Sequence, residues 1–425
     1  MTSLPIRPIR NIVLGIALLL LASGIGYKLG EKRAFSLPGA FLRPLTNVTQ
    51  PTTSEPVNFG LFWDVWARIH RYYIDAANIN TQKLVWGAIS GMVNALDDPY
   101  TVFLPPKENK EFKEDIGGTF EGIGAQLDLK DNRIIIVSPL KGTPAEKAGL
   151  KPFDWIMKVD GEDTVGWALS EAVSKIRGPR GTKVVLTILS ENEEKPRDVE
   201  IMRDGIIVPS VDSWMKKGID IQEISGSSSS ARLSNQSIGY IHLSRFGDRT
   251  SDEWNSAVSQ VAEAWSTRKI KGMILDMRNN PGGYLDGSVF IVSEFVKSGL
   301  VVTQTNSDGT SQDYTVDRRG KLTDIPIVIL INKGSASASE IVAGALRDLR
   351  RITIVGETSF GKGSVQTPQE LEGGASIHIT TGKWILPKGD WINKKGIAPD
   401  VSITWDNPTA TNDAQLAKAI EVLLQ

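Results

Sequence analysis

The sequence predicts an α/β domain in the C-terminal half of the chain, preceded by a small β-rich module and by a helical N-terminal region. Apolar runs of strand length alternate with helical patterns from residue 238 onward, which is the pattern of βαβ units. One of these runs, residues 327–331, is entirely apolar and is typical of a buried strand. At 425 residues the chain is long enough for two or three such domains.

The first 29 residues are predicted to direct the chain to a membrane. Arg7 and Arg10 precede an uncharged, mainly apolar run at residues 11–27. As a helix this run would span roughly 26 Å, just short of a typical ~30 Å hydrocarbon core. It fits an uncleaved signal anchor or, if it is cut at the small residues 22–24, a signal peptide that releases a secreted form. Either way the rest of the chain is expected outside the cytoplasm, on the periplasmic or extracellular side.

Residues 30–57 and 58–114 are predicted to be a tether and a helical region. The tether contains several prolines among polar residues. In the second segment Phe62, Ile69 and Tyr72 recur at helical spacing. Because these helices are rich in aromatic residues, we expect a packing or dimerisation element, and hence a homo-oligomer formed through the N-terminal helices.

Residues 115–205 are predicted to form the β-rich module. Its apolar runs indicate strands near residues 134–137, 155–159 and 184–189, with short helices at 144–149 and 169–176. A serine-rich stretch, residues 225–234, indicates a flexible connection.

Residues 206–405 are predicted to form the α/β domain, followed by a C-terminal helix within residues 406–425. The expected strands are 238–243, 272–276, 327–331 and 352–355, and the expected helices are 252–265, 288–296 and 337–349.

Composition excludes several chemistries. The chain has no cysteine, so cysteine nucleophiles, disulfides and cysteine-ligated metals are excluded. Its net charge of -1 offers no basic patch, so nucleic acid is not an expected partner. The three histidines, His70, His242 and His378, lie in no recognisable catalytic context. A serine–lysine pair is therefore the natural hypothesis for a nucleophile and its base.

Three serines that alternate with alanine follow the apolar run 327–331. Ser335, Ser337 and Ser339 lie at a strand-to-helix turn, where the first N–H groups of a helix lack internal partners. Such a turn can present a hydroxyl and also stabilise an oxyanion. Serine is equally a favoured helix cap, so capping and catalysis both stay open on the residues alone.

A lysine between two glycines follows the strand 352–355. If residues 362–366 are extended, Lys362, Ser364 and Gln366 share one face. Lysine acts as a base only when it is deprotonated, which burial favours. A lone lysine in a glycine loop is usually solvated, so this hypothesis requires the serines to be close.

Two further segments contain glycine motifs of the kind found in functional loops. Residues 279–283, Asn-Asn-Pro-Gly-Gly, predict a tight turn whose N–H groups could point at an oxyanion. The spacing of Gly356, Gly361 and Lys362 begins a P-loop, but residue 363 is glycine where serine or threonine is required, and no helix follows. No nucleotide, metal or other cofactor is expected.

Taken together, these motifs resemble the C-terminal processing peptidases, or tail-specific proteases, a family of serine peptidases. The resemblance covers residues 60–405. It rests on Asp98-Pro99-Tyr100, Gly122-Ile123-Gly124, residues 278–283, residues 335–340 and residues 360–366. It implies a crotonase/ClpP-like α/β protease core with a β-rich part, and a PDZ domain inserted before that core.

The resemblance also implies roles for individual residues. Ser337 would be the nucleophile, Lys362 the base and Gln366 the residue that orients the lysine. The oxyanion would be bound by backbone N–H groups of Ala338, Gly282 and Gly283. Asp348 matches an aspartate discussed for the family, but it lies roughly 16 Å along one helix from Ser337 at ~1.5 Å per residue. We expect it to pair instead with a nearby cation such as Arg347 or Arg351.

The PDZ resemblance assigns a carboxylate-binding loop to Gly122, Ile123, Gly124 and Ala125, where a substrate tail would add as a β-strand. The function expected from all of this is a membrane-anchored, extracytoplasmic serine endopeptidase. It would recognise apolar protein C-termini and cleave through an acyl-enzyme. The alternative is a catalytically silent PDZ scaffold that binds tails in the cell envelope.

Overall fold

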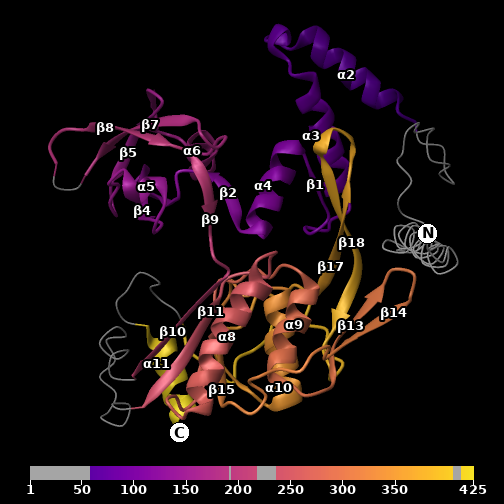
Figure 1. Cartoon of the computed structure of the whole chain (residues 1–425). Helices are drawn as coiled ribbons and strands as arrows, with labels where there is room; N and C mark the ends of the chain where they lie inside the picture. The colour runs from indigo at the N-terminus through magenta and orange to yellow at the C-terminus, as the bar shows by residue number, and fades with distance from the viewer. Residues whose placement is uncertain (1–57, 191–192, 218–235, 405–412) are drawn as a thin grey trace, which may run out of the picture. The chain divides into compact units, whose positions relative to one another are not determined.

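The computed structural model describes residues 58–190, 193–217, 236–404 and 413–425 (Figure 1). The predicted export segment, the tether and the serine-rich connection lie outside the described residues. Within the described ranges, no helix has both the length and the apolar character needed to cross a membrane. The chain divides into two compact units, residues 1–80 and 81–425.

The described part of the first unit is helix α2 (Gly60–Tyr72) and the short 3-10 helix η1 (Ala76–Asn78). Helix α2 buries none of its residues, although its sequence is strongly apolar on one side. Trp63 and Tyr72 are exposed, and Phe62 stacks on Trp66 with ring centroids 6.1 Å apart. The helix predicted here is confirmed, and its role in oligomer formation stays a prediction.

The second unit begins with α3 (Thr81–Asn94), β1 (Val102–Leu104) and α4 (Pro106–Gly117). Pro106 opens α4, where a missing N–H costs nothing, and Gly118 ends it in the left-handed conformation. Strand β1 pairs with β18 (Ser376–Ile385), and Phe103 packs with Val93 and Ala375. The region predicted to be helical therefore also supplies a strand, which pairs with β18. This strand was not predicted, because three residues are too few to give a strand pattern.

The β-rich module is a sheet in the order β3-β4-β5-β7-β8, and the strand pair β2–β9 connects it to the rest of its unit. The strands are β2 (Thr119–Gly122), β3 (Ala125–Lys130), β4 (Arg133–Pro139), β5 (Trp155–Val159), β7 (Lys183–Leu189), β8 (Arg197–Met202) and β9 (Asp204–Ile207). The short strand β6 (Glu162–Asp163) pairs with β5. Helices α5 (Pro144–Lys147) and α6 (Leu169–Ile176) complete the module. Strand β3 is an edge strand, and α6 contacts it.

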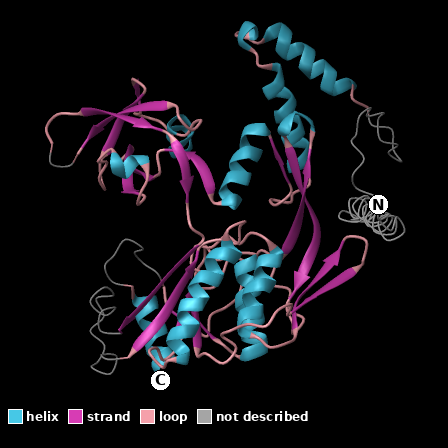
Figure 2. Ribbon diagram, viewed as in Figure 1, coloured by secondary structure: helices cyan, strands magenta, loops and turns pink. Residues whose placement is uncertain are grey.

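The α/β domain is built on a six-stranded sheet in the order β10-β11-β12-β15-β16-β19. Figure 2 shows strands of this domain in magenta beside the cyan helices that pack on them. Its strands are β10 (Val211–Lys217), β11 (Ser237–Leu243), β12 (Met273–Asp276), β15 (Ile327–Ile331), β16 (Thr353–Gly356) and β19 (Val401–Ser402). All neighbouring pairs are parallel except β10–β11.

Helices cover both faces of this sheet. On one face α8 (Thr250–Ser266), α9 (Leu285–Phe295) and α10 (Ala338–Arg350) bury the main apolar core. On the other face α11 (Ala414–Leu424) covers alternate residues of the same strands, such as Ile274 and Leu330. This double burial explains why the strands have continuous apolar sequences, and it confirms the predicted βαβ alternation.

A second sheet joins β1, β18, β13 (Leu300–Asn306) and β14 (Ser311–Thr315), and β17 (Ser364–Glu370) pairs with β18 (Figure 1). The neighbouring parallel strands β12 and β15 end at the same edge of the first sheet. The turns that follow them, residues 277–283 and 332–337, therefore meet, and β16 leads into the lysine loop beside them.

Candidate active site

Two of the three alternating serines are buried and make hydrogen bonds that hold neighbouring turns together. Ser335 is fully buried; its Oγ donates to the carbonyl of Met277 (2.8 Å) and accepts from the N–H of Asn332 (3.0 Å). Ser339 is also fully buried, and its Oγ donates to the carbonyl of Asn280 (2.9 Å). Ser337 is only half-buried. The structure therefore leaves Ser337 as the accessible hydroxyl of this turn.

Ser337 has a strained backbone at the start of helix α10. As the N-cap it has φ 54° and ψ -115°, a region that residues with a side chain rarely adopt. Such strain costs about 1–3 kcal/mol and persists only where the surroundings enforce it. Here the N–H of Ser337 donates to Glu340 Oε2 (2.8 Å), which fixes the turn. The hydroxyl is thereby held at the positive end of the helix dipole.

The carboxylate of Glu340 connects the serine turn to the lysine loop. Its Oε2 accepts from the backbone N–H groups of both Ser337 (2.8 Å) and Lys362 (2.9 Å). Its Oε1 accepts from the N–H of Gly361 (2.7 Å) and the hydroxyl of Ser359 (2.6 Å). Because both N–H groups donate to the same oxygen atom, the backbone nitrogens of Ser337 and Lys362 are separated by at most the combined length of these two hydrogen bonds. The two segments do meet, as the serine–lysine hypothesis requires.

Glu340 is fully buried, and this burial raises its pKa even though four hydrogen bonds favour the charged form. Its role was not predicted from the sequence. A signal was present, because Ser337-x-x-Glu340 is the capping-box pattern in which the glutamate side chain reaches back to the first residue of the turn.

The glycines beside Lys362 are required by close backbone contacts. A Cβ on Gly361 would lie 2.9 Å from the nitrogen of Gly396, and one on Gly363 would lie 2.7 Å from Nε1 of Trp391. Gly361 also has φ 90°, which favours glycine. The two glycines therefore allow the loop to pack closely against Gly396 and Trp391.

The amine of Lys362 lies in a half-buried site. Burial lowers the pKa of Lys362, while the carboxylates of Asp98 and Glu340 pull it back toward its usual value; the net direction is downward. The aromatic ring of Tyr100 lies 5.2 Å from Nζ. A lowered pKa increases the fraction of neutral amine, which is the form that can take a proton from a serine hydroxyl.

Gln366 lies on β17 and donates from Nε2 to Ser364 Oγ (2.9 Å) and Thr380 Oγ1 (3.1 Å). The prediction that Ser364 and Gln366 share a face is confirmed by their contact. Lys362 precedes the strand, and β17 has an irregular register between residues 365 and 366, so the regular alternation does not extend to the lysine.

The Gly282–Gly283 turn packs directly against the serine turn. A Cβ on Gly282 would lie 2.8 Å from Cβ of Ser337 and 3.0 Å from the nitrogen of Ala338. The N–H of Gly282 already donates to Asn280 Oδ1 (2.9 Å), which makes Gly283 the freer of the two amides. Ala338 is the first residue of α10, so its N–H has no acceptor within the helix.

This packing gives a direct prediction for Gly282→Ala. The added methyl group would collide with Ser337 at a φ of 100°, so we expect kcat/KM to fall by about 100-fold or more, the scale of losing an oxyanion donor. Gly309→Ala is the matched control, since Gly309 also has positive φ (83°) but faces open space. Equal activity losses in the two variants would contradict the prediction.

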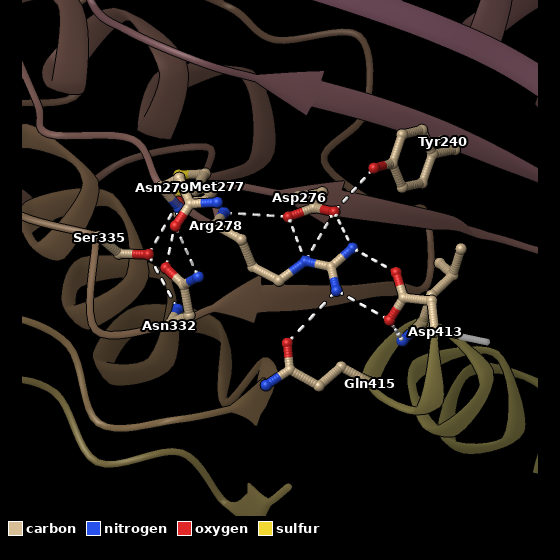
Figure 3. Close-up of polar contacts among 10 residues, drawn as sticks. Tyr240, Asp276, Met277, Arg278, Asn279, Asn332, Ser335, Asp413 and Gln415 are labelled. Atoms are coloured by element: carbon tan, nitrogen blue, oxygen red, sulfur yellow. Dashed lines mark hydrogen bonds and ion pairs between the residues drawn. The ribbon is translucent and has the colours of Figure 1, made fainter. Parts of the chain in front are cut away.

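A buried ionic cluster holds the turn that leads to Gly282 (Figure 3). Arg278 pairs with Asp276 (2.6 Å) at the end of β12 and with Asp413 (2.8 Å) before α11. Burial opposes the charge of Arg278, but the two carboxylates outweigh it and raise its pKa further. The hydroxyl of Tyr240 donates to Asp276 (2.7 Å), and Gln415 accepts from Arg278 (3.3 Å). Sequence reasoning did not find this cluster, because its members come from three separate segments, at residues 240, 276–278 and 413–415.

A pair of asparagines joins the two turns next to this cluster. The N–H of Asn279 donates to Asn332 Oδ1, and Asn332 Nδ2 donates to Asn279 Oδ1, each at 2.8 Å (Figure 3). The end of β12 is therefore locked to the end of β15.

Asp348 lies away from the serine, as expected. Its side chain is buried, and its carboxylate lies 3.7 Å from both Arg347 Nε and Lys388 Nζ. The expected pairing with a nearby cation is confirmed for Arg347, and Lys388 is a second partner.

The loop Gly122–Ala125 joins β2 to the edge strand β3 in the β-rich module. The carbonyl of Ile123 accepts from the N–H of Ala145, and that of Gly124 accepts from the N–H of Leu140, each at 2.8 Å. A Cβ on Gly124 would lie 2.5 Å from Thr143, so glycine is required there. The predicted carboxylate-binding loop is therefore a fixed turn beside an open strand edge.

Comparisons with known proteins match three parts of the chain. Residues 237–403 match the model of peptidase family S41, residues 112–189 that of the PDZ domain, and residues 45–108 that of the activating protease CtpB N-terminal domain.

Curated relatives match most of this chain. The carboxy-terminal processing protease CtpA of Bacillus subtilis (strain 168) is 40% identical over 75% of this chain and 64% of its own length. CtpB of the same strain is 36% identical over 81% and 68%. The carboxy-terminal-processing protease of Bartonella bacilliformis is 37% identical over 84% and 77%.

Among solved structures, a putative S41 protease from Bacteroides fragilis has the same fold. The match covers 87% of this chain and 98% of that one, with a TM-score of 0.52 and 16% identity.

Proposed function

This chain belongs to peptidase family S41, and we propose that it is a serine endopeptidase that recognises protein C-termini and cleaves with a Ser337–Lys362 dyad. The family match confirms the resemblance found in the sequence, together with its PDZ domain. The observation that carries the dyad is the shared carboxylate of Glu340, which accepts from the N–H groups of both Ser337 and Lys362.

In the proposed reaction the neutral amine of Lys362 takes the hydroxyl proton of Ser337 as Oγ attacks the scissile carbonyl. The N–H groups of Ala338 and Gly283 donate to the resulting oxyanion. The ammonium of Lys362 then returns its proton to the leaving amine, and the C–N bond breaks to leave an acyl-enzyme. Water, deprotonated by Lys362, attacks the ester, and the proton returns to Ser337.

Gln366 has the role of orienting the lysine in this proposal. Both of its hydrogen bonds use Nε2 as the donor. Its Oε1 is therefore available to accept an N–H from Nζ of Lys362, which would direct the single lone pair of the neutral amine toward Ser337.

The PDZ domain would select the substrate. A tail added to β3 would bring its carboxylate to the N–H groups of the Gly122–Ala125 loop. The side chains beside that loop are apolar: Ile123 is in the core of the module, and Leu127 and Leu169 pack against that core. Apolar C-termini fit these surroundings best.

We place this enzyme outside the cytoplasm, anchored by residues 1–29. The support is the run of uncharged residues 11–27 behind Arg7 and Arg10. Cleavage of this segment would give a secreted form.

The rate of covalent labelling of Ser337 by a fluorophosphonate probe tests this function. Because Lys362 acts only when deprotonated, we expect the rate to rise with pH and level off above the pKa of Lys362, which burial places below that of free lysine. A tail peptide is added so that an inactive resting state cannot conceal the reaction. The control is Lys362→Ala, which should label slowly at every pH.

The same experiment separates the enzyme from a catalytically silent PDZ scaffold. Absence of label at Ser337 with tail binding preserved would establish the scaffold. A labelling rate that peaks below neutrality would contradict lysine as the base.

A further inference from the structure

The segment between α3 and β1 lies against the catalytic lysine, and none of its residues has a role in the proposed reaction. Its residues Asp98, Pro99, Tyr100 and Thr101 place the ring of Tyr100 5.2 Å from Nζ of Lys362. Tyr100 is half-buried. Burial, with the carboxylates of Glu340 and Asp98, raises the pKa of its hydroxyl, so the ring is neutral at physiological pH. A neutral ring at this distance both covers the amine and attracts its charged form.

Hydrogen bonds hold this segment in one conformation. Asp98 accepts from the N–H of Tyr100 (3.1 Å) and from the hydroxyl of Thr101 (2.7 Å). Burial alone would raise the pKa of Asp98, but hydrogen bonds from Thr380, Thr101 and the backbone outweigh it and lower the pKa. Asp98 is therefore ionised at neutral pH and adds a negative charge to the surroundings of Lys362.

The segment is also fixed to the strand that holds Gln366. Thr101 is buried, and its Oγ1 accepts from the N–H of Thr380 on β18 (3.0 Å). Thr380 Oγ1 in turn accepts from Gln366 Nε2 (3.1 Å). The segment that carries Tyr100 and the amide of Gln366 are thus both hydrogen-bonded to Thr380.

We propose that Tyr100 and Asp98 are positioning residues for Lys362. The ring shields the amine from water, while the carboxylate fixes the ring and places a negative charge near Nζ. This inference rests on the proposed role of Lys362 as the base.

The two residues act on the amine in opposite directions. Exclusion of water by the ring favours the neutral amine and outweighs the attraction of the ring for the cation, because burial is the largest influence on the pKa of Lys362. A nearby carboxylate favours the ammonium. Among the described residues, the other ionisable groups that interact with Lys362 are Glu340 from α10 and His378 from β18. Glu340 favours the ammonium as Asp98 does, and a charged His378 would oppose it. Replacing Tyr100 or Asp98 should therefore change the proton affinity of Lys362 with opposite signs.

The proton affinity of Lys362 can be measured without catalysis. The full chain carrying Ser337→Ala is trace-labelled with acetic anhydride across a pH range, and acetylation of Lys362 is followed by mass spectrometry, with exposed Lys158 as the internal reference. Tyr100→Ala should raise the apparent pKa of Lys362 by about one unit, because water reaches the ammonium. Tyr100→Phe, which keeps the ring, should leave it unchanged.

Asp98→Asn should lower the apparent pKa of Lys362 by about one unit, because an opposite charge is removed. Asp97→Asn is the matched control: it removes the same charge one residue earlier, from an exposed position with φ 53° that asparagine tolerates. If Tyr100→Ala does not fold, Asp98→Asn, which preserves the shape of the side chain, decides the matter.

With Ser337 intact, the pH profile of peptide hydrolysis should shift with Lys362. We expect Tyr100→Ala to lose about 10-fold in kcat at neutral pH, as the neutral fraction of the amine falls, and Tyr100→Phe to restore it. No shift in Tyr100→Ala, an equal defect in Tyr100→Phe, or an Asp98→Asn shift no larger than that of Asp97→Asn would overturn the inference. If the pKa of Lys362 shifts as expected in these variants but the wild-type chain has no peptidase activity, the proposed function is wrong. Tyr100 and Asp98 are then still the residues that set the pKa of Lys362.

Discussion

Ser337→Ala should abolish hydrolysis of a tail-bearing protein and leave the fold intact. The hydroxyl is half-buried, and it is the side-chain oxygen that the strained turn presents at the start of α10. Loss of a nucleophile in serine hydrolases costs a factor of at least about 10⁴ in kcat. The melting temperature should stay within a few degrees of wild type, since alanine keeps the backbone bond to Glu340.

The flanking serines provide controls with the opposite outcome. Ser335→Ala would leave the buried N–H of Asn332 without its acceptor, which costs about 1–3 kcal/mol of stability. Ser339→Ala would remove a donor to the carbonyl of Asn280, which still accepts from the N–H of Ala336 (2.9 Å), and should cost less. Both variants should melt earlier and keep activity per folded molecule within about 10-fold.

Hydrolysis is measured as kcat/KM on a peptide with an apolar C-terminus, and stability by thermal unfolding of the same preparations. Ser337→Ala with wild-type turnover would exclude the dyad. A Ser339→Ala variant that is stable but inactive would show that Ser339, and not Ser337, is the nucleophile.

The parts of the fold that could be predicted are those with a local pattern. Strands β12 and β15 are buried on both faces, so each is a continuous apolar run in the sequence. Helices α8 and α10 show the helical spacing of residues that pack on one face of the sheet. Each of these elements is specified by its own residues.

The parts that could not be predicted depend on a distant partner. Strand β1 has only three residues, and what makes it a strand is its pairing with β18. The contacts of Arg278 with Asp413, and of Tyr100 with Lys362, join segments more than a hundred residues apart. The spacing of residues within either segment does not predict such a contact.

The candidate site divides in the same way. The serine run 335–339 and Lys362 could be chosen as candidates because each lies in a short contiguous motif, and the resemblance to a known family then selected Ser337. The sequence could not show that Ser337 and Lys362 meet. Glu340 provides that connection. Its capping-box position was readable, whereas its bonds to Gly361 and Lys362 required the folded structure.

Glu340→Gln should separate activity from folding. The amide offers one acceptor oxygen where the carboxylate offers two, and its NH₂ would face N–H groups that now donate to Glu340. Its single acceptor oxygen can serve either the N–H groups of Ser337 and Lys362 or the N–H of Gly361 and the hydroxyl of Ser359, and the other pair of donors then faces the NH₂ group. In either orientation the link between the serine turn and the lysine loop weakens, so that the hydroxyl and the amine no longer share a fixed geometry. Displacement of catalytic groups by about 1 Å can cost 100-fold, so kcat should fall by at least that factor.

Glu294→Gln is the matched control for this experiment. Glu294 is as deeply buried as Glu340; it lies in the last turn of α9, where it pairs with Arg318 (2.7 Å). Removing its charge leaves a partly buried cation unpaired and should lower the melting temperature at least as much as Glu340→Gln does. Its kcat per folded molecule should equal that of wild type.

The comparison decides what the Glu340 carboxylate does. If both variants lose stability and only Glu340→Gln loses kcat, the carboxylate holds the serine and the lysine in register. If Glu340→Gln keeps wild-type kcat at a lowered melting temperature, its four hydrogen bonds serve the fold alone, and the dyad must be positioned by Gly282 and by the Tyr100 segment. Whether Glu340→Gln loses kcat therefore identifies which contacts bring Ser337 and Lys362 together.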